Sequence, residues 1–296
     1  MSMDKLIVLV GPTSSGKTFL AIKLAKKYNG EIVSADSRQV YKGMDIGTGK
    51  ATKKEQRMVK HCLLDIASPK RAYNVAHFKK DAQQMIKKIH RQNKLPFLVG
   101  GTGFWIQAVV DNIDFPAVKP NKLFRRRLSK FSTTQLLKKL KKLDPQRAKN
   151  IDKKNPYRLI RALEIIKSTK KPITPLHRQR IFKSLTIGLN PPRKKLYALI
   201  DRRLTKRFRQ GMINEVKKLH QQGVSWTRLF DFGLEYRYIS LYLRKKLTYR
   251  QMVEELRQAS RGYAKRQITW FRRDRRIYWI KNQAQAGRLI KKFLAQ

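Results

Sequence analysis

The chain of 296 residues has one cysteine, few acidic residues and no long apolar run. The single cysteine, Cys62, excludes an intramolecular disulfide and any zinc finger built on several cysteines, and it favours a reducing compartment. No apolar run approaches the roughly 18 residues that cross a bilayer, and the first residues lead directly into an expected strand. The sequence therefore predicts a soluble, cytoplasmic protein with no membrane segment.

The shortage of acidic residues leaves a large excess of positive charge. The 19 Asp and Glu residues stand against 70 Lys and Arg, and the formal net charge is +51. Such an excess repels itself in a compact fold, so a polyanionic partner is the leading interpretation, with nucleic acid first among polyanions. The alternative is a general drift toward lysine, which carries no information about partners. The uneven spread of the charge along the chain favours the polyanion.

Expected strands alternate with expected helices at both ends of the chain. The expected strands are residues 6–10, 31–36, 61–66, 95–99, 184–189 and 277–280. This alternation predicts an α/β fold, a parallel sheet with helices on both faces. Residues 119–183 lack a strand pattern and are strongly basic, so they are expected to form a helical insertion domain that binds nucleic acid. The expected core then consists of residues 1–118 and 184–296.

Helical patterns dominate the chain beyond the insertion. One long basic helix is expected over residues 194–222, and two further helices over 234–243 and 249–273. Near the other end, the glycine-rich segment 42–52 follows neither a helical nor a strand period. Such a segment suggests a mobile loop beside an active site.

The sequence GPTSSGKT at residues 11–18 fits the phosphate-binding pattern G-x-x-x-x-G-K-[ST]. It follows an expected strand and precedes an expected helix, so the core is predicted to be P-loop NTPase-like. Gly11 and Gly16 permit a tight turn that points backbone N–H groups inward, and the helix start adds its dipole. Lys17 is expected to reach the terminal phosphates, and Thr18 to hold Mg²⁺. The predicted phosphate-binding residues are Gly11, Pro12, Thr13, Ser14, Ser15, Gly16, Lys17 and Thr18.

Two further turns follow strands of the same expected sheet, at residues 36–39 and 100–103. Ligands of parallel α/β sheets bind beyond the carboxyl ends of the strands, so these turns and residues 11–18 are expected to line one crevice. The motif leaves open whether the bound phosphates belong to a hydrolysed nucleotide, to a phosphoryl donor or to a diphosphate that departs as a leaving group.

Asp36 is the main candidate for acid–base chemistry, because it lies at a strand end next to the phosphate loop. On spacing alone, a capping or magnesium-orienting role is equally compatible. Asp65 is a second candidate for the magnesium role, although a loop cap explains it better. Side chains that could read a base edge or a phosphate, or simply build a turn, are Ser37, Arg38, Gln39 and Thr102.

Two basic stretches outside these turns suit RNA. Arg158 and Arg161 lie three residues apart, on one face of an expected helix, where they could contact phosphates or form a solvated surface. Residues 264–273 interleave cations with aromatic side chains, which suits RNA or a pyrophosphate. Trp270 and Phe271 are equally compatible with an ordinary core.

Taken together, six stretches resemble the tRNA dimethylallyltransferase family, also called the tRNA isopentenyltransferase or IPP transferase family, in its bacterial type. They lie in register over almost the whole chain. A P-loop alone would be weak support, whereas six motifs in order are strong. The stretches are GPTSSGKT (11–18), DSRQVYKGMDIGTGK (36–50), HCLLDI (61–66), FLVGGTGFW (97–105), NPYRLIRALEI (155–165) and AKRQITWFRRD (264–274).

The resemblance implies that residues 11–18 hold the diphosphate of dimethylallyl diphosphate. N6 of adenosine 37, next to the anticodon of tRNA and flipped out of its stack, would attack the allylic carbon as diphosphate leaves. The resemblance assigns catalysis to Asp36, Lys17 and Thr18, with Mg²⁺ on Thr18. A monomer is expected. The residues implied to contact tRNA are Asp36, Ser37, Arg38, Gln39, Thr102, Arg125, Tyr157, Arg158, Leu159, Ile160, Arg161, Lys265, Arg266 and Gln267.

Two other functions stay open at this point. An adenylate isopentenyltransferase would perform related chemistry on a free nucleotide, but a small substrate does not need a large basic insertion. An RNA-binding P-loop ATPase or kinase would use Asp65 for Mg²⁺. The chain also departs from the family at residues 233–237, GLEYR, where members often carry a Gly-Tyr pair.

Overall fold

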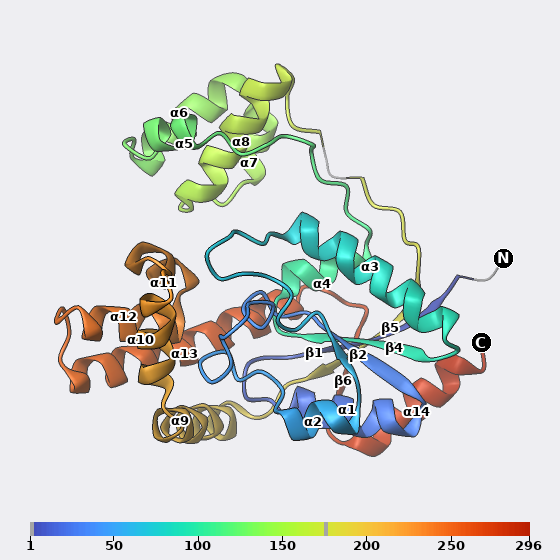
Figure 1. Ribbon diagram of the computed structural model, residues 1–296. Helices are drawn as coiled ribbons and strands as arrows, with labels where there is room; N and C mark the ends of the chain where they lie inside the picture. Colours follow the sequence, from blue (N-terminus) through green and yellow to red (C-terminus); the bar gives the residue numbers. More distant parts are fainter. Residues whose placement is uncertain (1–2, 175–176) are drawn as a thin grey trace. The chain divides into compact units, whose positions relative to one another are not determined.

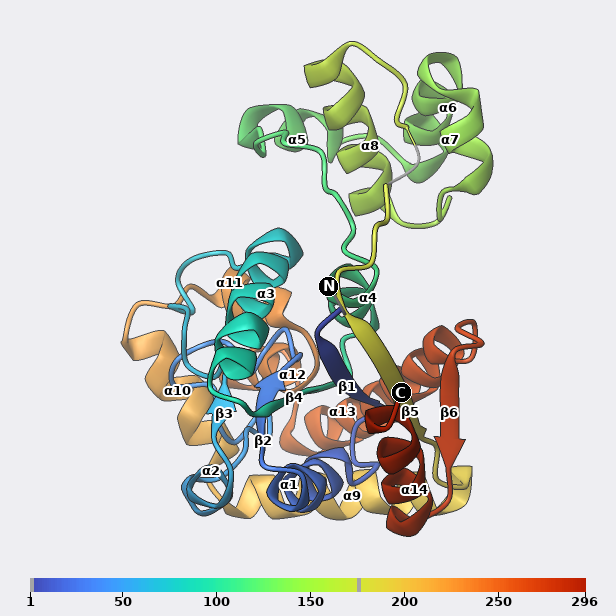
Figure 2. The same ribbon diagram turned by 90° about the vertical axis from the view of Figure 1, so that its right-hand side faces the viewer.

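Strand β1 (Lys5–Val10) lies inside a sheet, and its apolar run is buried on both faces. The structure, a computed structural model, describes residues 3–174 and 177–296. The other strands in these residues are β2 (Gly30–Ser34), β3 (His61–Cys62), β4 (Leu95–Gly100), β5 (Lys183–Leu189) and β6 (Ile277–Ile280). Their order is β3-β2-β4-β1-β5-β6, and each neighbouring pair is parallel (Figure 1, Figure 2). The predicted parallel α/β sheet is confirmed.

Helices cover both faces of this sheet, as predicted. The covering helices are α1 (Lys17–Lys27), α3 (Val75–Arg91), α4 (Gly103–Val110) and α14 (Gln283–Leu294). Successive side chains of a strand point to opposite faces. Leu6 and Val8 therefore enter one core with α3 and α4, whereas Ile7 and Leu9 enter the other with α1 and α14. The two pairs of helices lie on opposite faces of the sheet (Figure 1).

The strand expected at residues 61–66 is shorter than predicted. β3 ends at Cys62, because Leu63 and Asp65 adopt positive φ angles of 62° and 56° that an extended ladder does not allow. The short helix α2 (Lys53–Met58) precedes it and begins at a capping box formed by Thr52 and Glu55.

The long helix expected over residues 194–222 is two helices, so that prediction is wrong. The chain leaves the helical path at Gly211, whose φ of 90° is left-handed and therefore favours glycine. The predicted helix at 234–243 is confirmed, and the one at 249–273 ends two residues early. The helices of this region are α9 (Arg193–Arg209), α10 (Met212–Gln221), α11 (Trp226–Phe232), α12 (Leu234–Leu243) and α13 (Tyr249–Phe271).

Ile113–Arg178 form a second unit, separate from the one that contains the sheet. Its helices are α5 (Lys122–Leu128), α6 (Thr133–Leu143), α7 (Pro145–Asn150) and α8 (Pro156–Thr169). Each begins at a polar residue whose side chain accepts a backbone N–H bond, namely Asn121, Ser132, Asp144 and Asn155. The unit has a hydrophobic core of its own, centred on α6 and α8.

The limits of this unit differ from the predicted insertion of 119–183. Phe182 is buried in the core of the sheet-bearing unit, and Lys183 is the first residue of β5. The end of the insertion was therefore placed too late, because a basic, strand-free composition does not reveal where the chain rejoins the sheet. No helix in the described part of the chain is long and apolar enough to cross a membrane.

Candidate active site

A cleft of ≈ 750 Å³ lies in the sheet-bearing unit, where β1, β2 and β4 end. Residues of all three predicted turns line it. Thr13, Lys17 and Thr18 come from the phosphate loop, Asp36 to Gln39 from the turn after β2, and Gly100 to Thr102 from the turn after β4. The prediction that these turns share one crevice is confirmed.

The phosphate loop, residues 11–18, folds tightly between β1 and α1. A Cβ on Gly11 would stand 2.6 Å from the carbonyl oxygen of Leu189, so only glycine fits beside β5. Gly16 has a left-handed φ of 88° and immediately precedes the first residue of α1. Ser15 Oγ is buried and has no hydrogen-bond partner among the described residues. A buried hydroxyl needs a partner, and a phosphate oxygen held at a helix N-terminus would supply one.

Lys17 is half-buried in this loop, and its Nζ donates a hydrogen bond to the carbonyl oxygen of Pro12 at 2.6 Å. Burial and the neighbouring positive charge of Arg203 lower the pKa of Lys17 to about 7, and the negative charge of Asp36 opposes them only in part. An anion that enters the cleft would favour the charged lysine. Lys17 is therefore ready to take up a proton together with a diphosphate.

Asp36 shapes the turn that follows β2. Its Oδ1 accepts hydrogen bonds from the backbone N–H groups of Arg38, at 2.9 Å, and Gln39, at 3.4 Å. The Thr102 hydroxyl accepts a bond from the N–H of Ser37 at 3.1 Å, which joins the turns after β2 and β4. Asp36 thus caps the turn and lines the cleft, so the two sequence-based interpretations of this carboxylate are compatible.

Gln267 on α13 connects two of the turns. Its Oε1 accepts a hydrogen bond from the N–H of Thr13, and its Nε2 donates to the carbonyl oxygen of Gly101, both at 2.8 Å. Arg266 is exposed and also lines the cleft, whereas its neighbour Lys265 is exposed but stands outside the set of lining residues. The expected tRNA contacts of Lys265, Arg266 and Gln267 stay predictions.

Two arginines of α9 reach the cleft, and the sequence interpretation missed both. Arg203 Nη1 donates to Thr13 Oγ1 at 3.4 Å, and its Nη2 donates to the carbonyl oxygen of Gly49 at 3.2 Å. Burial and the repulsion of Arg207 lower the pKa of Arg203 to about 10. Arg207 Nη1 donates to the carbonyl oxygen of Gly47 at 3.1 Å and to Glu235 Oε1 at 2.9 Å. Among 70 basic residues, no motif distinguishes these two.

The segment 231–238 also lines the cleft. Arg38 Nε donates to the carbonyl oxygen of Phe232 at 2.7 Å, and its guanidinium lies over the Phe232 ring. Tyr263 is a further lining residue, and its pKa is raised by burial and by the negative charge of Asp36. Within this segment, only GLEYR at residues 233–237 stood out in the sequence, and only because it departs from the family pattern.

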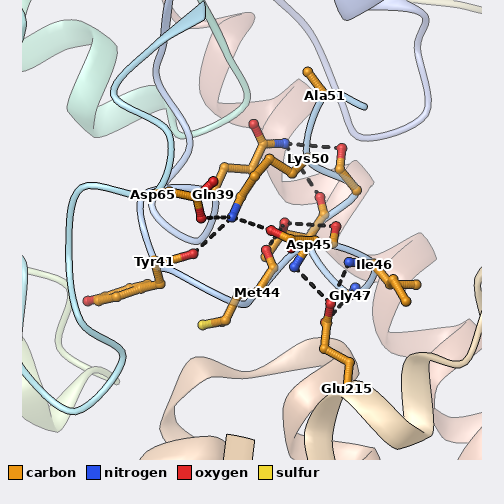
Figure 3. A network of polar contacts seen from close by, with 12 residues as sticks. Gln39, Tyr41, Met44, Asp45, Ile46, Gly47, Lys50, Ala51, Asp65 and Glu215 are labelled. Atoms are coloured by element: carbon orange, nitrogen blue, oxygen red, sulfur yellow. Dashed lines mark hydrogen bonds and ion pairs between the residues drawn. The ribbon is translucent and has the colours of Figure 1, made fainter. Parts of the chain in front are cut away.

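The glycine-rich segment 42–52 is held by polar contacts around the buried Lys50, contrary to the mobile loop expected. Lys50 Nζ donates to the carbonyl oxygen of Tyr41 at 2.9 Å and pairs with Asp45 and Asp65, each at 2.5 Å (Figure 3). Asp65 is thus occupied as the partner of a buried lysine and does not line the main cleft. This arrangement argues against the magnesium role that was considered for Asp65.

The comparisons with known proteins agree with this site. The family model described as IPP transferase matches residues 39–274. The chain is 42% identical over 281 residues to a tRNA dimethylallyltransferase of Anoxybacillus flavithermus, and the alignment covers 94% of this chain and 90% of the relative. It is 40% identical over 288 residues to that of Acetivibrio thermocellus, covering 94% and 92%.

The chain belongs to the IPP transferase family. The resemblance seen in the six sequence stretches is thereby confirmed.

The fold of this IPP transferase is similar to that of solved relatives. The tRNA isopentenylpyrophosphate transferase of Bacillus halodurans aligns with a TM-score of 0.74 at 37% identity, covering 99% of this chain and 96% of that chain. A eukaryotic dimethylallyltransferase acting on tRNA aligns with a TM-score of 0.74 at 26% identity, covering 90% and 69%.

In the helical unit of this IPP transferase, Glu164 binds two of the arginines predicted to contact tRNA. Its Oε1 and Oε2 accept bonds from Arg125 Nε and Nη2 at 2.8 and 2.6 Å, and Oε2 also accepts one from Arg161 Nη1 at 2.5 Å. Burial opposes ionisation of Glu164, but the two arginines outweigh it and lower its pKa to about 2. Arg125 and Arg161 therefore have a structural partner within the unit.

The remaining candidates on α8 divide between surface and core. Tyr157 is 79% exposed, and the side chain of Arg158 is 56% exposed. Leu159 and Ile160 are buried in the core of the unit. These two side chains are packing residues, so Tyr157 and Arg158 present the surface that a nucleic acid can reach.

Proposed function

We propose that this IPP transferase transfers the dimethylallyl group of dimethylallyl diphosphate to N6 of adenosine 37, next to the anticodon of tRNA, and releases diphosphate. The observation that carries the proposal is the shared cleft, in which a phosphate loop and the Asp36 turn face the same space. Relatives that align over more than nine tenths of this chain are named tRNA dimethylallyltransferases. The proposal joins their activity to this site.

The diphosphate end of the donor would bind at residues 11–18. The N–H groups of the loop and the N-terminus of α1 favour an anion, and the unpaired Ser15 hydroxyl offers a further donor. Lys17 and Arg203 would add positive charge on the side of the leaving group. Because their fixed donors need little reorganisation when charge develops, they would stabilise the departing diphosphate.

The acceptor adenine would bind beside Asp36. Its N6 attacks C1 of the dimethylallyl group, the N6–C1 bond forms, and the C1–O bond breaks with its electron pair leaving on diphosphate. Asp36 would take the proton that N6 loses. Since the N–H groups of Arg38 and Gln39 hold Asp36 Oδ1, the carboxylate is oriented before the substrate arrives.

A magnesium ion fits this site as a companion of the diphosphate. No group of three His, Cys, Asp or Glu residues in 3–174 and 177–296 could hold a metal by itself. Mg²⁺ commonly binds through one or two protein oxygens together with substrate phosphates, and the hydroxyl of Thr18 is available in the cleft. When bound there, the ion would neutralise charge on the leaving diphosphate.

The tRNA would use the basic helical unit as well as the cleft. Arg158 and Tyr157 of α8 combine an exposed cation with an exposed aromatic ring, which suits RNA phosphates and bases. The predictions of a monomer and of a cytoplasmic location stay predictions.

The proposal is tested by following radiolabelled dimethylallyl diphosphate with two acceptors, unmodified tRNA and AMP, and by measuring ATP turnover in parallel. Unmodified tRNA should become labelled, and AMP should not. Label on AMP instead of tRNA would support an adenylate isopentenyltransferase. ATP turnover stimulated by RNA, without any label transfer, would support the ATPase or kinase.

A further inference from the structure

The loop of residues 44–50 wraps around the carboxylate of Glu215, which lies in the first turn of α10. Glu215 Oε2 accepts hydrogen bonds from the backbone N–H groups of Asp45 and Ile46 at 2.8 and 2.7 Å. Its Oε1 accepts one from Gly47 at 3.0 Å (Figure 3). Successive N–H groups that converge in this way form an anion-binding concavity. Here the bound anion is a side chain of the protein itself.

Tyr236 also binds the carboxylate of Glu215. Its hydroxyl donates a hydrogen bond to Glu215 Oε1 at 2.8 Å, and the residue is only 1% exposed. A Cβ on Gly47 would lie 2.8 Å from the Tyr236 ring, so the loop packs directly on the tyrosine. Loop, carboxylate and phenol therefore form one continuous, partly buried hydrogen-bonded contact.

Backbone carbonyl groups of the same loop accept hydrogen bonds from the two arginines of the cleft. Gly47 accepts from Arg207, and Gly49 accepts from Arg203. A Cβ on Gly49 would stand 1.9 Å from the Nη2 atoms of both arginines, so the guanidinium groups come as close as a glycine allows. Arg203 in turn reaches the phosphate loop through Thr13.

We propose that Glu215 is a positioning residue for the diphosphate, which acts through the loop 44–50 to fix Arg203 and Arg207 beside the phosphate loop. The inference rests on the proposed function, because it takes the cleft to be the diphosphate site. Glu215 does not line that cleft, so it acts on the substrate only through the loop.

The loop is anchored at a second point, which makes the effect of Glu215 separable from unfolding. Lys50 binds the carbonyl oxygen of Tyr41 and the carboxylates of Asp45 and Asp65 without using Glu215, so these bonds should persist when Glu215 changes. The Glu215→Gln variant keeps the side chain's shape but exchanges one acceptor oxygen for an NH₂ group, which cannot accept from the backbone N–H groups it faces. The loop should then shift locally and carry the two arginines with it.

The experiment measures binding of inorganic pyrophosphate by calorimetry, without tRNA, to wild type, Glu215→Gln and the control Glu254→Gln. Glu254 on α13 is a half-exposed carboxylate that pairs with Arg257 on its own helix. Glu215→Gln should weaken pyrophosphate binding roughly 10- to 100-fold, as loss of an orienting outer-shell partner commonly does. Glu254→Gln should bind like wild type.

Steady-state kinetics separate positioning from a general loss of structure. Glu215→Gln should raise KM for dimethylallyl diphosphate and leave KM for tRNA unchanged. A partly unfolded enzyme would instead lower the apparent kcat and leave both KM values unchanged, because only the fraction of active enzyme falls. The Gly49→Ala variant displaces the same two arginines, because the added Cβ would collide with their guanidinium groups. It should therefore raise KM for dimethylallyl diphosphate selectively, and it tests the proposal even if Glu215→Gln does not fold.

The outcomes distinguish the positioning role from the proposed diphosphate site. Pyrophosphate binding by Glu215→Gln and Gly49→Ala within about twofold of wild type would overturn the positioning role alone. If wild type itself failed to bind pyrophosphate, the diphosphate site of the proposed function would be refuted, and this inference with it.

Discussion

Protonation of Lys17 should couple donor binding to pH. In the free protein its pKa is about 7, because the ammonium is buried and lies near Arg203. A bound diphosphate stabilises the charged form and returns the pKa toward its ordinary value of 10.5. Binding above pH 7 must therefore include proton uptake. The affinity is highest at low pH and falls as the pH rises through the pKa of the free protein.

The size of the effect follows from the protonated fraction of Lys17. That fraction drops from about one half at pH 7 to about 0.01 at pH 9, so dimethylallyl diphosphate should bind about 50-fold more weakly at pH 9. Calorimetry in two buffers of different ionisation enthalpy measures the protons directly. At pH 8 wild type should take up about 0.9 proton per donor bound.

Lys17→Arg is the matched control, because a guanidinium stays protonated throughout this range. Subtracting its pH profile removes titration of the ligand itself. A wild-type profile parallel to that of Lys17→Arg, with no proton uptake at pH 8, would refute the lowered pKa and the role of Lys17 as a ligand of the diphosphate.

Three further predictions concern the base, the RNA surface and the helical unit. Asp36→Asn keeps a turn-capping oxygen and should lower kcat by roughly 10²- to 10⁴-fold with tRNA affinity largely retained; weaker tRNA binding at unchanged kcat would contradict the role as base. The affinity for tRNA, measured by filter retention, should fall steeply as the salt concentration rises, because binding releases counterions. An affinity that does not change with salt would contradict the role of the basic surface in binding tRNA. Glu164→Gln should destabilise the helical unit by about 3 kcal/mol near neutral pH, since the wild-type carboxylate contributes stability above pH ~4.5 that is lost as the pH falls toward 2. Chemical denaturation of the two proteins at pH 7 measures this difference, and equal midpoints would show that the arginine pairs stabilise nothing.

The sheet was predictable because its signals are local. Runs such as residues 6–10 are apolar at every position, as expected for strands buried on both faces, and each ends in a polar or glycine-rich turn. The break at Gly211 was not predictable, since the basic helical pattern continues on either side of it. One left-handed residue there separates α9 from α10.

The site was predictable where a motif or a strand end marks it, as at residues 11–18, Asp36 and Thr102. Arg203, Arg207 and Glu215 carry no such mark, because long-range packing alone brings them to the loop of residues 44–50. Leu159 shows the opposite error. The family resemblance implies a contact of Leu159 with tRNA, but the helical period of α8 turns its side chain into the core.

The central claim is that the phosphate loop holds a leaving diphosphate and that adenosine N6 in tRNA is the acceptor. Mass spectrometry of nucleosides from tRNA treated with the enzyme and dimethylallyl diphosphate, combined with an assay of released diphosphate, tests it most directly. We predict N6-dimethylallyl adenosine at position 37, with one diphosphate released for each modified base. Unmodified tRNA with no diphosphate released, under conditions in which the protein binds both substrates, would contradict the account.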